Sequence, residues 1–183
     1  SDAKVLYVAS GEGLQRPDLS VGNGIYRSGD GGKTWSHLGL RDGQQIPSLA
    51  VDPRDSNRLF AAVLGHPYGP NPERGIFRST DGGKNWKKVL SIDENTGGND
   101  VDIDPSDPDV VYASFWQGRQ GPWEYGNGYG GDKGGIFKST DGGATWKQLS
   151  GGLPDHIVQA NLSIAPSDSK KLYVVLATTT SKI

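Results

Sequence analysis

A twelve-residue phrase that is repeated three times is the sequence feature that most constrains the fold of this chain. Each copy begins with Gly-Ile, an aromatic residue and a basic residue, and closes with a Gly-Gly pair followed three residues later by Trp. A second phrase, two alternating apolar residues followed by Pro-x-Asp, recurs in step with the first. The first phrase spans residues 24–35, 75–86 and 135–146, and the second spans residues 49–55, 101–107 and 162–168. Two phrases that keep the same order indicate one repeating unit.

The length of the unit narrows the choice of architecture. Asp30 and Asp81 are 51 residues apart, and Asp81 and Asp141 are 60 residues apart. Periods of this size are typical of propeller blades and solenoid arrays. Between the phrases, apolar residues alternate with polar ones or form short β-branched runs bounded by Gly, Pro, Asn and Asp, which indicates strands and not helices.

The pattern predicts four strands in each complete unit. In the second unit we expect them at residues 47–51, 58–64, 75–79 and 84–90, and in the third at residues 99–103, 110–116, 135–139 and 144–149. We therefore predict an all-β chain that forms a β-propeller of four-stranded antiparallel blades, because radial packing of such blades leaves only short, protected sheet edges.

The chain is expected to hold about three blades as a single propeller segment, with an incomplete blade at each end. Its first predicted strand, 5–9, and its last, 174–177, both correspond to the second strand of a blade. The predicted repeats are approximately 1–46, 47–98, 99–158 and 159–183, the first and last being partial blades. Propellers typically close with four to eight blades, so we expect further blades from a parent chain or from other subunits. The start at Ser1, without Met, agrees with a trimmed chain.

The close of the first phrase resembles the Asp-box, or BNR repeat, of sialidase-like and sortilin-type propellers. Ser and Asp have short side chains that can hydrogen-bond backbone amides in a tight turn, Gly-Gly adopts backbone angles that other residues avoid, and Trp can pack over the turn. Because the turn recurs in every blade, we interpret it as scaffold. Its structural residues are Ser28, Asp30, Gly32, Trp35, Ser79, Asp81, Gly83, Trp86, Ser139, Asp141, Gly143 and Trp146.

The sequence of the whole repeat, most clearly at residues 60–83 and 89–98, resembles the sequences of large secreted bacterial proteins with sortilin-type propellers. Such proteins are often labelled glycosyl hydrolases. The resemblance implies an exported protein, extracellular or periplasmic. The chain has no Cys, so no disulfide, thiol catalyst or Cys-based zinc site is expected. Its net charge is −2, without clusters of Lys or Arg, and no apolar run is long enough to span a bilayer. We predict no cofactor, no metal site, no nucleic-acid partner and no membrane insertion.

Function is expected in the connections between the second and third strands, which differ in length from blade to blade, since recognition usually lies in variable loops on a repetitive scaffold. These loops are residues 10–23, 65–74 and 117–134. Their aromatic, guanidinium and carboxylate groups suit sugar rings or an extended peptide, although Trp123 could instead pack on a neighbouring loop. The predicted ligand-binding residues are Tyr68, Trp116, Arg119, Trp123, Tyr125 and Tyr129. The preferred hypothesis is a segment that binds glycan or polypeptide and performs no catalysis alone.

The alternative is part of a glycoside hydrolase, which needs two facing carboxylates. Glu12 follows the strand 5–9 where xyloglucanase-type propellers place a catalytic Asp, and the resemblance implies that its partner would come from a second propeller. The alternating Asp100, Asp102 and Asp104 could bind a cation or substrate in a central channel, or could be solvated or cap backbone amides. The arginines are dispersed along the chain, so the three-arginine cluster of sialidases is not expected.

Overall fold

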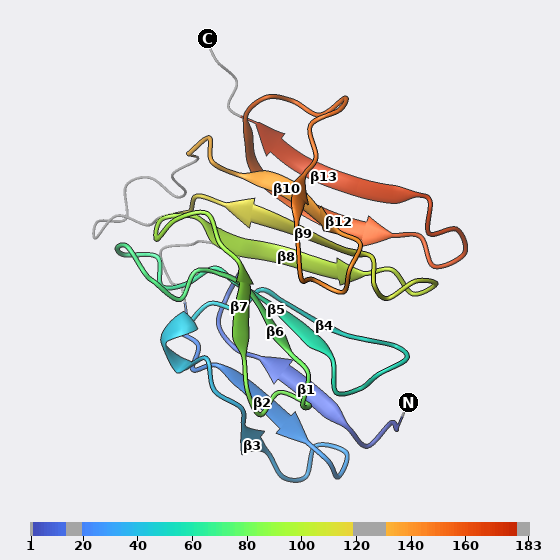
Figure 1. The fold of residues 1–183 in the computed structure, drawn as a ribbon. Helices are drawn as coiled ribbons and strands as arrows, with labels where there is room; N and C mark the ends of the chain where they lie inside the picture. Colours follow the sequence, from blue (N-terminus) through green and yellow to red (C-terminus); the bar gives the residue numbers. More distant parts are fainter. Residues whose placement is uncertain (1, 14–19, 119–130, 179–183) are drawn as a thin grey trace.

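The computed structural model describes residues 2–13, 20–118 and 131–178. In these residues the strands form four antiparallel sheets that follow one another along the chain (Figure 1). The first sheet contains β1 (Leu6–Ala9), β2 (Ile25–Ser28) and β3 (Ser36–His37). The second contains β4 (Ser48–Val51), β5 (Leu59–Val63), β6 (Gly75–Ser79) and β7 (Lys87–Leu90). The third contains β8 (Gly97–Ile103), β9 (Val111–Trp116), β10 (Gly135–Ser139) and β11 (Lys147–Gln148), and the last contains β12 (Ile157–Ile164) and β13 (Leu172–Thr178).

Each strand pairs with the strand that precedes or follows it in the sequence. The second and third sheets are complete four-stranded blades, and the first and last sheets are partial ones. The predicted all-β fold, a partial propeller of about three antiparallel blades, is therefore confirmed. A short 3-10 turn, η1 (Arg41–Gly43), connects the first sheet to the second.

The fourth strand of each complete blade is shorter than predicted. β7 begins at Lys87 instead of residue 84, and β11 contains only Lys147 and Gln148. The reason is the preceding turn, where the Asn85 and Thr145 amides donate to Asp-box carboxylates and not to a neighbouring strand. β8 begins earlier than predicted because Gly97 and Gly98 pair with β9, next to a β-bulge that the sequence does not signal.

The hydrophobic core lies between consecutive sheets. Phe60 and Ala62 of β5 pack with residues of the third sheet, such as Phe115, whereas Ala61 and Val63 pack with residues of the first sheet. All five residues of β5 are buried, as expected for a strand covered on both faces. Burial of a side chain such as Phe60 or Val63 contributes about 1.5–3 kcal/mol to stability. The second blade is therefore held by both of its neighbours.

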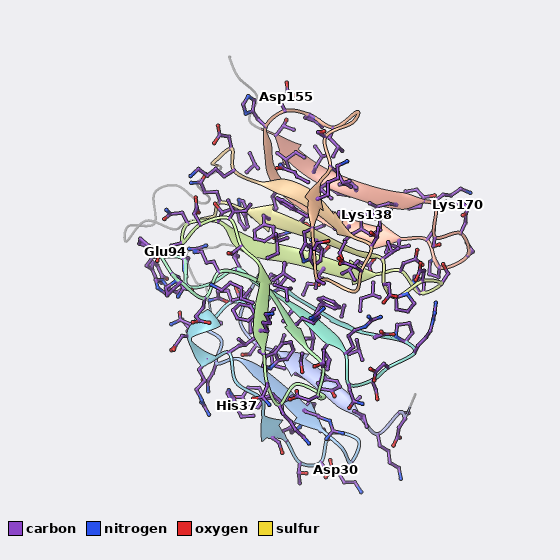
Figure 2. All side chains as sticks on the ribbon, viewed as in Figure 1. Asp30, His37, Glu94, Lys138, Asp155 and Lys170 are labelled. Carbon is purple, nitrogen blue, oxygen red and sulfur yellow. The ribbon has the colours of Figure 1, made fainter. Side chains whose placement is uncertain are left out.

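The connections lie at two opposite ends of the sheets. At one end, the Gly82 amide donates to the Asn57 carbonyl at 3.0 Å, so the β4–β5 and β6–β7 turns lie together. At the other end, the Asn71 amide donates to the Glu94 carbonyl at 2.9 Å, which joins the β5–β6 loop to the β7–β8 connection. We call these the Asp-box end and the variable-loop end. Figure 2 shows Glu94 at the variable-loop end and Lys170, in the β12–β13 turn, at the opposite end.

Candidate functional site

The three Asp-box turns share a common set of hydrogen bonds around their serine and aspartate. In the second, Ser79 Oγ donates to Asp81 Oδ1 at 2.8 Å and accepts from the Gly83 amide at 2.9 Å, while the Asn85 amide donates to Asp81 Oδ1 at 2.9 Å. Gly82 and Gly83 have φ of 74° and 89°, angles that favour glycine. The Asn85 amide and side chain, and then Ser79, lower the pKa of Asp81 to about 2. These turns satisfy their own polar groups, which leaves their carboxylates little capacity for a ligand.

The three Asp-box tryptophans make different contacts. Trp86 Nε1 donates across the blade junction to the Leu38 carbonyl at 2.9 Å. The Trp146 ring meets Phe60 of the preceding blade edge-on, with 6.5 Å between ring centroids. Trp35 donates instead to the Gly32 carbonyl of its own turn at 3.0 Å, and 43% of its surface is exposed. The tryptophan therefore connects a blade to the preceding blade where the described residues include one.

Two of the alternating aspartates on β8 bridge to the next blade. Asp100 Oδ2 accepts from the Leu162 amide at 2.8 Å, and Asp102 Oδ2 accepts from the Ile164 amide at 3.0 Å. Burial raises the pKa of Asp102 above its usual value, and the charges of Asp100 and Asp104 add to the effect. Both carboxylates thus cap backbone amides, which is one of the roles considered for them. No group of three or more metal-ligating side chains occurs among the described residues.

The third aspartate, Asp104, organises a turn at the Asp-box end. Its Oδ1 accepts from the Ser106 amide at 2.8 Å, from the Ser106 hydroxyl at 2.7 Å and from the Asp107 amide at 3.2 Å. Burial acts to raise the pKa of Asp104, but these hydrogen bonds outweigh it and the pKa is lowered. Asp52 occupies the same position in the second blade and accepts from the Arg54 amide at 2.7 Å. Both residues are part of the scaffold.

At the variable-loop end, a buried glutamine holds the base of the first loop. Gln45 Oε1 accepts from the Glu12 amide at 2.5 Å, and Gln45 Nε2 donates to the Ser20 carbonyl at 3.3 Å. The two arms of the loop are thereby fixed to the chain that leads into β4. The side chain of Glu12, the candidate catalytic residue, is half-buried at this position.

A buried arginine anchors the other two variable loops. Arg74 Nη1 donates to the Leu64 carbonyl at 2.7 Å and to the Gly118 carbonyl at 3.3 Å, and Nη2 donates to the His66 carbonyl at 2.8 Å. The 65–74 loop and the start of the 117–134 loop thus share one guanidinium. Sequence analysis did not single out Gln45 or Arg74. For Arg74 the available signal was its place directly before the largely buried strand β6, whereas Gln45, beside Gln44 and three residues before β4, carried no such signal.

The predicted ligand-binding residues are only partly placed. Arg119, Trp123, Tyr125 and Tyr129 lie outside the described residues. Tyr68 projects from the 65–74 loop, with 55% of its surface exposed. Trp116 lies at the end of β9 and is only 6% exposed, which leaves it little surface for a ligand.

A small cavity of about 110 Å³ lies near the variable-loop end of the third blade. Gly134, Leu149 and Pro154 are among the residues that line it. A larger pocket, of about 670 Å³, lies at the Asp-box end. The variable-loop end thus offers an exposed tyrosine on an anchored loop, a half-buried carboxylate and a shallow cavity, which together could bind an extended ligand.

Comparison with known proteins supports the propeller architecture. The model of the Sortilin-Vps10 family, described as "Sortilin, neurotensin receptor 3", matches residues 23–150. The xyloglucanase Xgh74A of Acetivibrio thermocellus is 33% identical over 87% of this chain and 20% of its own length. A xyloglucanase of Paenibacillus sp is 30% identical over 85% of this chain and 16% of its own length. The chain therefore spans about a fifth of the length of the curated relatives it matches.

Solved structures agree in fold. The GH74 enzyme of Niastella koreensis superposes on 94% of this chain with a TM-score of 0.65 at 21% identity, and the match covers 23% of that enzyme. The GH74 xyloglucanase of Xanthomonas campestris superposes on 86% of this chain with a TM-score of 0.54, also at 21% identity, and the match covers 23% of that enzyme.

Proposed function

Because the chain belongs to the Sortilin-Vps10 family, we propose that it is a segment of a xyloglucanase-like glycoside hydrolase and that its own role is to bind glycan at the variable-loop end. The observation that carries the proposal is the 33% identity to a xyloglucanase over 87% of this chain. The segment matches only 20% of that enzyme, so we assign hydrolysis to the intact protein and not to these blades alone.

The 65–74 loop is suited to a binding role because it is held in one conformation before a ligand arrives. Arg74 donates to carbonyls on both sides of the loop, and Asn71 Nδ2 donates to the Asp42 carbonyl at 3.2 Å. An exposed tyrosine on an anchored loop provides a rigid aromatic face, and binding then costs little ordering entropy. We propose that Tyr68 packs against a sugar ring.

The 117–134 loop is proposed to extend the same binding surface. Its base lies beside the 65–74 loop because Arg74 also donates to the Gly118 carbonyl. Trp123, Tyr125, Tyr129 and Arg119 would then add stacking faces and a hydrogen-bond donor along one glycan chain. Trp116 is buried at the base of this loop, so we propose that it supports the loop and does not itself contact the ligand.

Hydrolysis of a glycosidic bond normally requires a pair of carboxylates. Glu12 is the carboxylate of this chain that we propose for such a pair, because it lies on a variable loop whose base is fixed by Gln45. The second carboxylate would come from the rest of the protein. A retaining or inverting mechanism would follow from the separation of the two groups.

The test is xyloglucan hydrolysis by the intact protein, with reducing ends measured against substrate concentration. Tyr68→Ala should raise KM severalfold with kcat nearly unchanged, and Tyr68→Trp should restore KM because it keeps an aromatic face. Glu12→Gln should lower kcat by at least about 100-fold, as expected for loss of a catalytic acid or base. Glu73→Gln, at the same end, is the matched control and should leave kcat unchanged.

Two outcomes would contradict the proposal. One is an intact protein that neither hydrolyses nor binds xyloglucan but retains a polypeptide at the same end. The other is full activity of both Tyr68→Ala and Glu12→Gln. If Glu12→Gln alone were fully active, the glycan-binding role would stand and the catalytic assignment of Glu12 would be wrong.

We also propose that further blades, from the same protein or from another subunit, cover the two outer sheets. Tyr173 and Val175 of β13 are 62% and 79% exposed, and Leu6 and Val8 of β1 are 40% and 46% exposed. Apolar residues gathered on a sheet face indicate an interaction surface. The protein is proposed to be exported, extracellular or periplasmic. Among the described residues, no helix is long and apolar enough to cross a membrane.

A further inference from the structure

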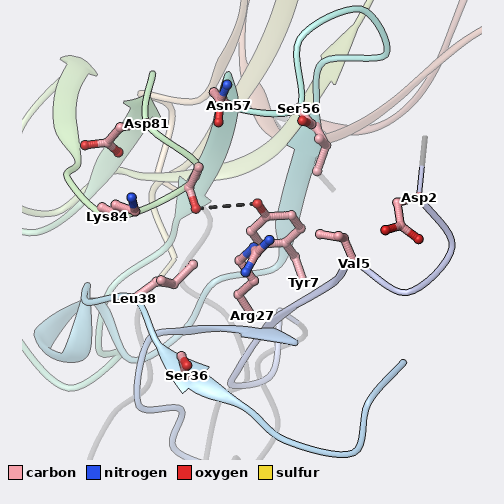
Figure 3. Close-up of a pocket in the computed structure, with 12 residues that line it drawn as sticks. Asp2, Val5, Tyr7, Arg27, Ser36, Leu38, Ser56, Asn57, Asp81 and Lys84 are labelled. Atoms are coloured by element: carbon pink, nitrogen blue, oxygen red, sulfur yellow. Dashed lines mark hydrogen bonds between the residues drawn. The ribbon is translucent and has the colours of Figure 1, made fainter. Parts of the chain in front are cut away.

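A pocket of about 670 Å³ lies between the first and second sheets at the Asp-box end. Tyr7 occupies its centre, and its hydroxyl donates to the Gly82 carbonyl at 3.4 Å across the blade junction (Figure 3). The lining residues include Val5, directly before β1, Arg27 of β2, Asn57 in the β4–β5 turn and Lys84 in the β6–β7 turn. This volume falls in the range of small-molecule sites, about 300–1,000 Å³.

The equivalent position between the second and third sheets is filled by an arginine. Arg58 Nε donates to Asp52 at 2.6 Å, Nη1 donates to Asp109 at 2.8 Å and Nη2 donates to the Pro108 carbonyl at 2.9 Å. A second arginine, Arg78, donates to the Gly142 carbonyl at 2.7 Å. Two guanidinium groups thus close that junction and find their acceptors inside the protein.

The strand register makes Val5 the counterpart of Arg58, because each directly precedes the strand residue that pairs with an Asp-box serine. At the first junction the short side chain of Val5 therefore occupies the position at which the long side chain of Arg58 bridges the second junction. The difference in length leaves space for the pocket. In the same comparison, Asn57 corresponds to Asp109 and Lys84 corresponds to Ala144. One guanidinium and one carboxylate are lost and one ammonium is gained, so these positions carry one more positive charge at the first junction than at the second.

Arg27 corresponds to Arg78 but has lost its internal acceptor. Arg78 donates to the Gly142 carbonyl, but the equivalent carbonyl at the first junction, that of Gly82, accepts from the Tyr7 hydroxyl. The Arg27 guanidinium lies instead over the Tyr7 ring, 5.9 Å from its centroid. Within the described part of the chain, neither Arg27 nor Lys84 has a hydrogen-bond acceptor or an ion-pair partner for its charged group. Both cations line the pocket.

The two carboxylates that line the pocket already have donors. Asp81 accepts from Ser79 and from the amide and side chain of Asn85. Asp2 Oδ1 accepts from the Lys4 amide at 2.9 Å. Asp81 therefore has little hydrogen-bonding capacity left, whereas the donors of Arg27 and Lys84 are unused within the described part of the chain.

We propose that this pocket binds a carboxylate-bearing sugar, a uronic acid unit, as a site separate from the variable-loop end. A guanidinium matches a carboxylate with two parallel hydrogen bonds, which Arg27 would supply, and Lys84 would add charge. Ser36, Ser56 and Asn57 provide neutral groups for hydroxyls, while Val5 and Leu38 provide apolar surface for the ring. The site goes beyond the proposed function, because xyloglucanase activity does not require an acidic sugar.

The experiment is titration of the intact protein with glucuronate, followed by calorimetry, with glucose as the neutral comparison. Wild-type protein should bind glucuronate and not glucose, and binding should weaken as salt is added because the charges are partly exposed. Arg27→Gln should weaken binding at least tenfold, and Lys84→Gln about threefold. Lys33→Gln, at the same position of the first Asp-box turn, is the matched control and should bind as wild type.

Filling the pocket provides an independent test. Val5→Arg restores the residue type found at the other junction, and it should abolish glucuronate binding while preserving the melting temperature. If Val5→Arg does not fold, the Arg27 and Lys84 variants still decide the matter. Equal binding of glucose and glucuronate, no binding in the millimolar range, or binding of a short poly-glutamate peptide in place of glucuronate would overturn the proposal. Each of these outcomes is independent of xyloglucan hydrolysis.

Discussion

Single side chains in this protein stabilise either their own turn or the junction to a neighbouring blade. The Asp-box serine and aspartate act within one turn, where Asp81 accepts three hydrogen bonds. Trp86 belongs to the same turn but donates its indole N–H to Leu38 of the previous blade. The two kinds of residue should therefore respond differently to substitution.

Loss of the Asp81 charge should change how stability depends on pH. The pKa of Asp81 is lowered to about 2 in the folded chain, from its ordinary value of 3.8. The ionised form therefore contributes stability that is fully present above pH 3.8 and is lost as the pH falls toward 2. We expect the melting temperature of Asp81→Asn to fall less than that of wild type between pH 4 and pH 2, in thermal melts followed by circular dichroism. Asp42→Asn, in the exposed η1 turn, controls for loss of a surface carboxylate.

Trp86→Phe should destabilise the junction between the first two blades. The substitution keeps an aromatic ring but removes the donor to the half-buried Leu38 carbonyl, which should cost about 1 kcal/mol. Trp35→Phe should cost less, because Trp35 bonds only within its own turn and is 43% exposed. Urea denaturation of both variants measures the difference. Equal losses would show that the inter-blade hydrogen bond contributes nothing.

β8 and β12 are connected through side chains. Asp100 and Asp102 lie two residues apart on β8. They accept from the amides of Leu162 and Ile164, which lie two residues apart on β12. Ser48 of β4 stands in the position of Asp100, and its hydroxyl accepts from the Val101 amide of β8 at 3.3 Å. The innermost strands thus form a series of side-chain to backbone contacts from one blade to the next.

Asp102→Ala should loosen β12. The Ile164 amide would lose its acceptor, which we expect to cost about 1–3 kcal/mol and to speed hydrogen exchange at that amide. Asp102→Asn keeps a side-chain oxygen and should retain most of the protection. Unchanged exchange of the Ile164 amide in Asp102→Ala would contradict the bridging role.

The blade architecture could be predicted from the sequence, whereas the junctions could not. Residues 24–35 and their copies carry the turn chemistry locally, so a single phrase such as Ser-x-Asp-Gly-Gly was sufficient. The acceptor of Trp86 is 48 residues away and the donor to Asp102 is 62 residues away, distances over which pattern arguments say nothing. The same holds for Arg74, whose acceptor Gly118 is 44 residues distant.

Of the two candidate ligand sites, one could be predicted from the sequence and the other could not. Variable loop length pointed to the 65–74 loop and to Tyr68. The pocket around Tyr7 depends on Val5 standing where Arg58 stands one blade later, and this correspondence has meaning only once the blades are placed side by side.

At the scale of the whole described segment, the first and last sheets expose apolar faces. Val175 on the last sheet and Val8 on the first occupy positions that are buried in the second blade, at Ala62 and Ala61. These exposed faces are proposed to be covered by further blades.

Charges placed on the outer faces should distinguish the two sources of such blades. If residues 1–183 are prepared alone, we expect concentration-dependent association in light scattering, which Val175→Glu should reduce. In the intact protein, Val175→Glu should instead lower the melting temperature, because the residue would be buried against a blade of the same chain. Lys170→Glu, in the adjacent turn, is the control. A monomer of residues 1–183 at all concentrations, with no effect in the intact protein, would contradict the proposal.

The pairing of each strand with its sequence neighbour has a consequence for how the chain acquires its structure. Every ladder joins strands that are neighbours in the sequence, so the strands of one blade can pair without waiting for residues of another blade. A blade can form as soon as its four strands have left the ribosome, and Trp86 then finds the Leu38 carbonyl already in place. We therefore expect assembly during synthesis to proceed from the first blade onward, each finished blade serving as the template on which the next one docks.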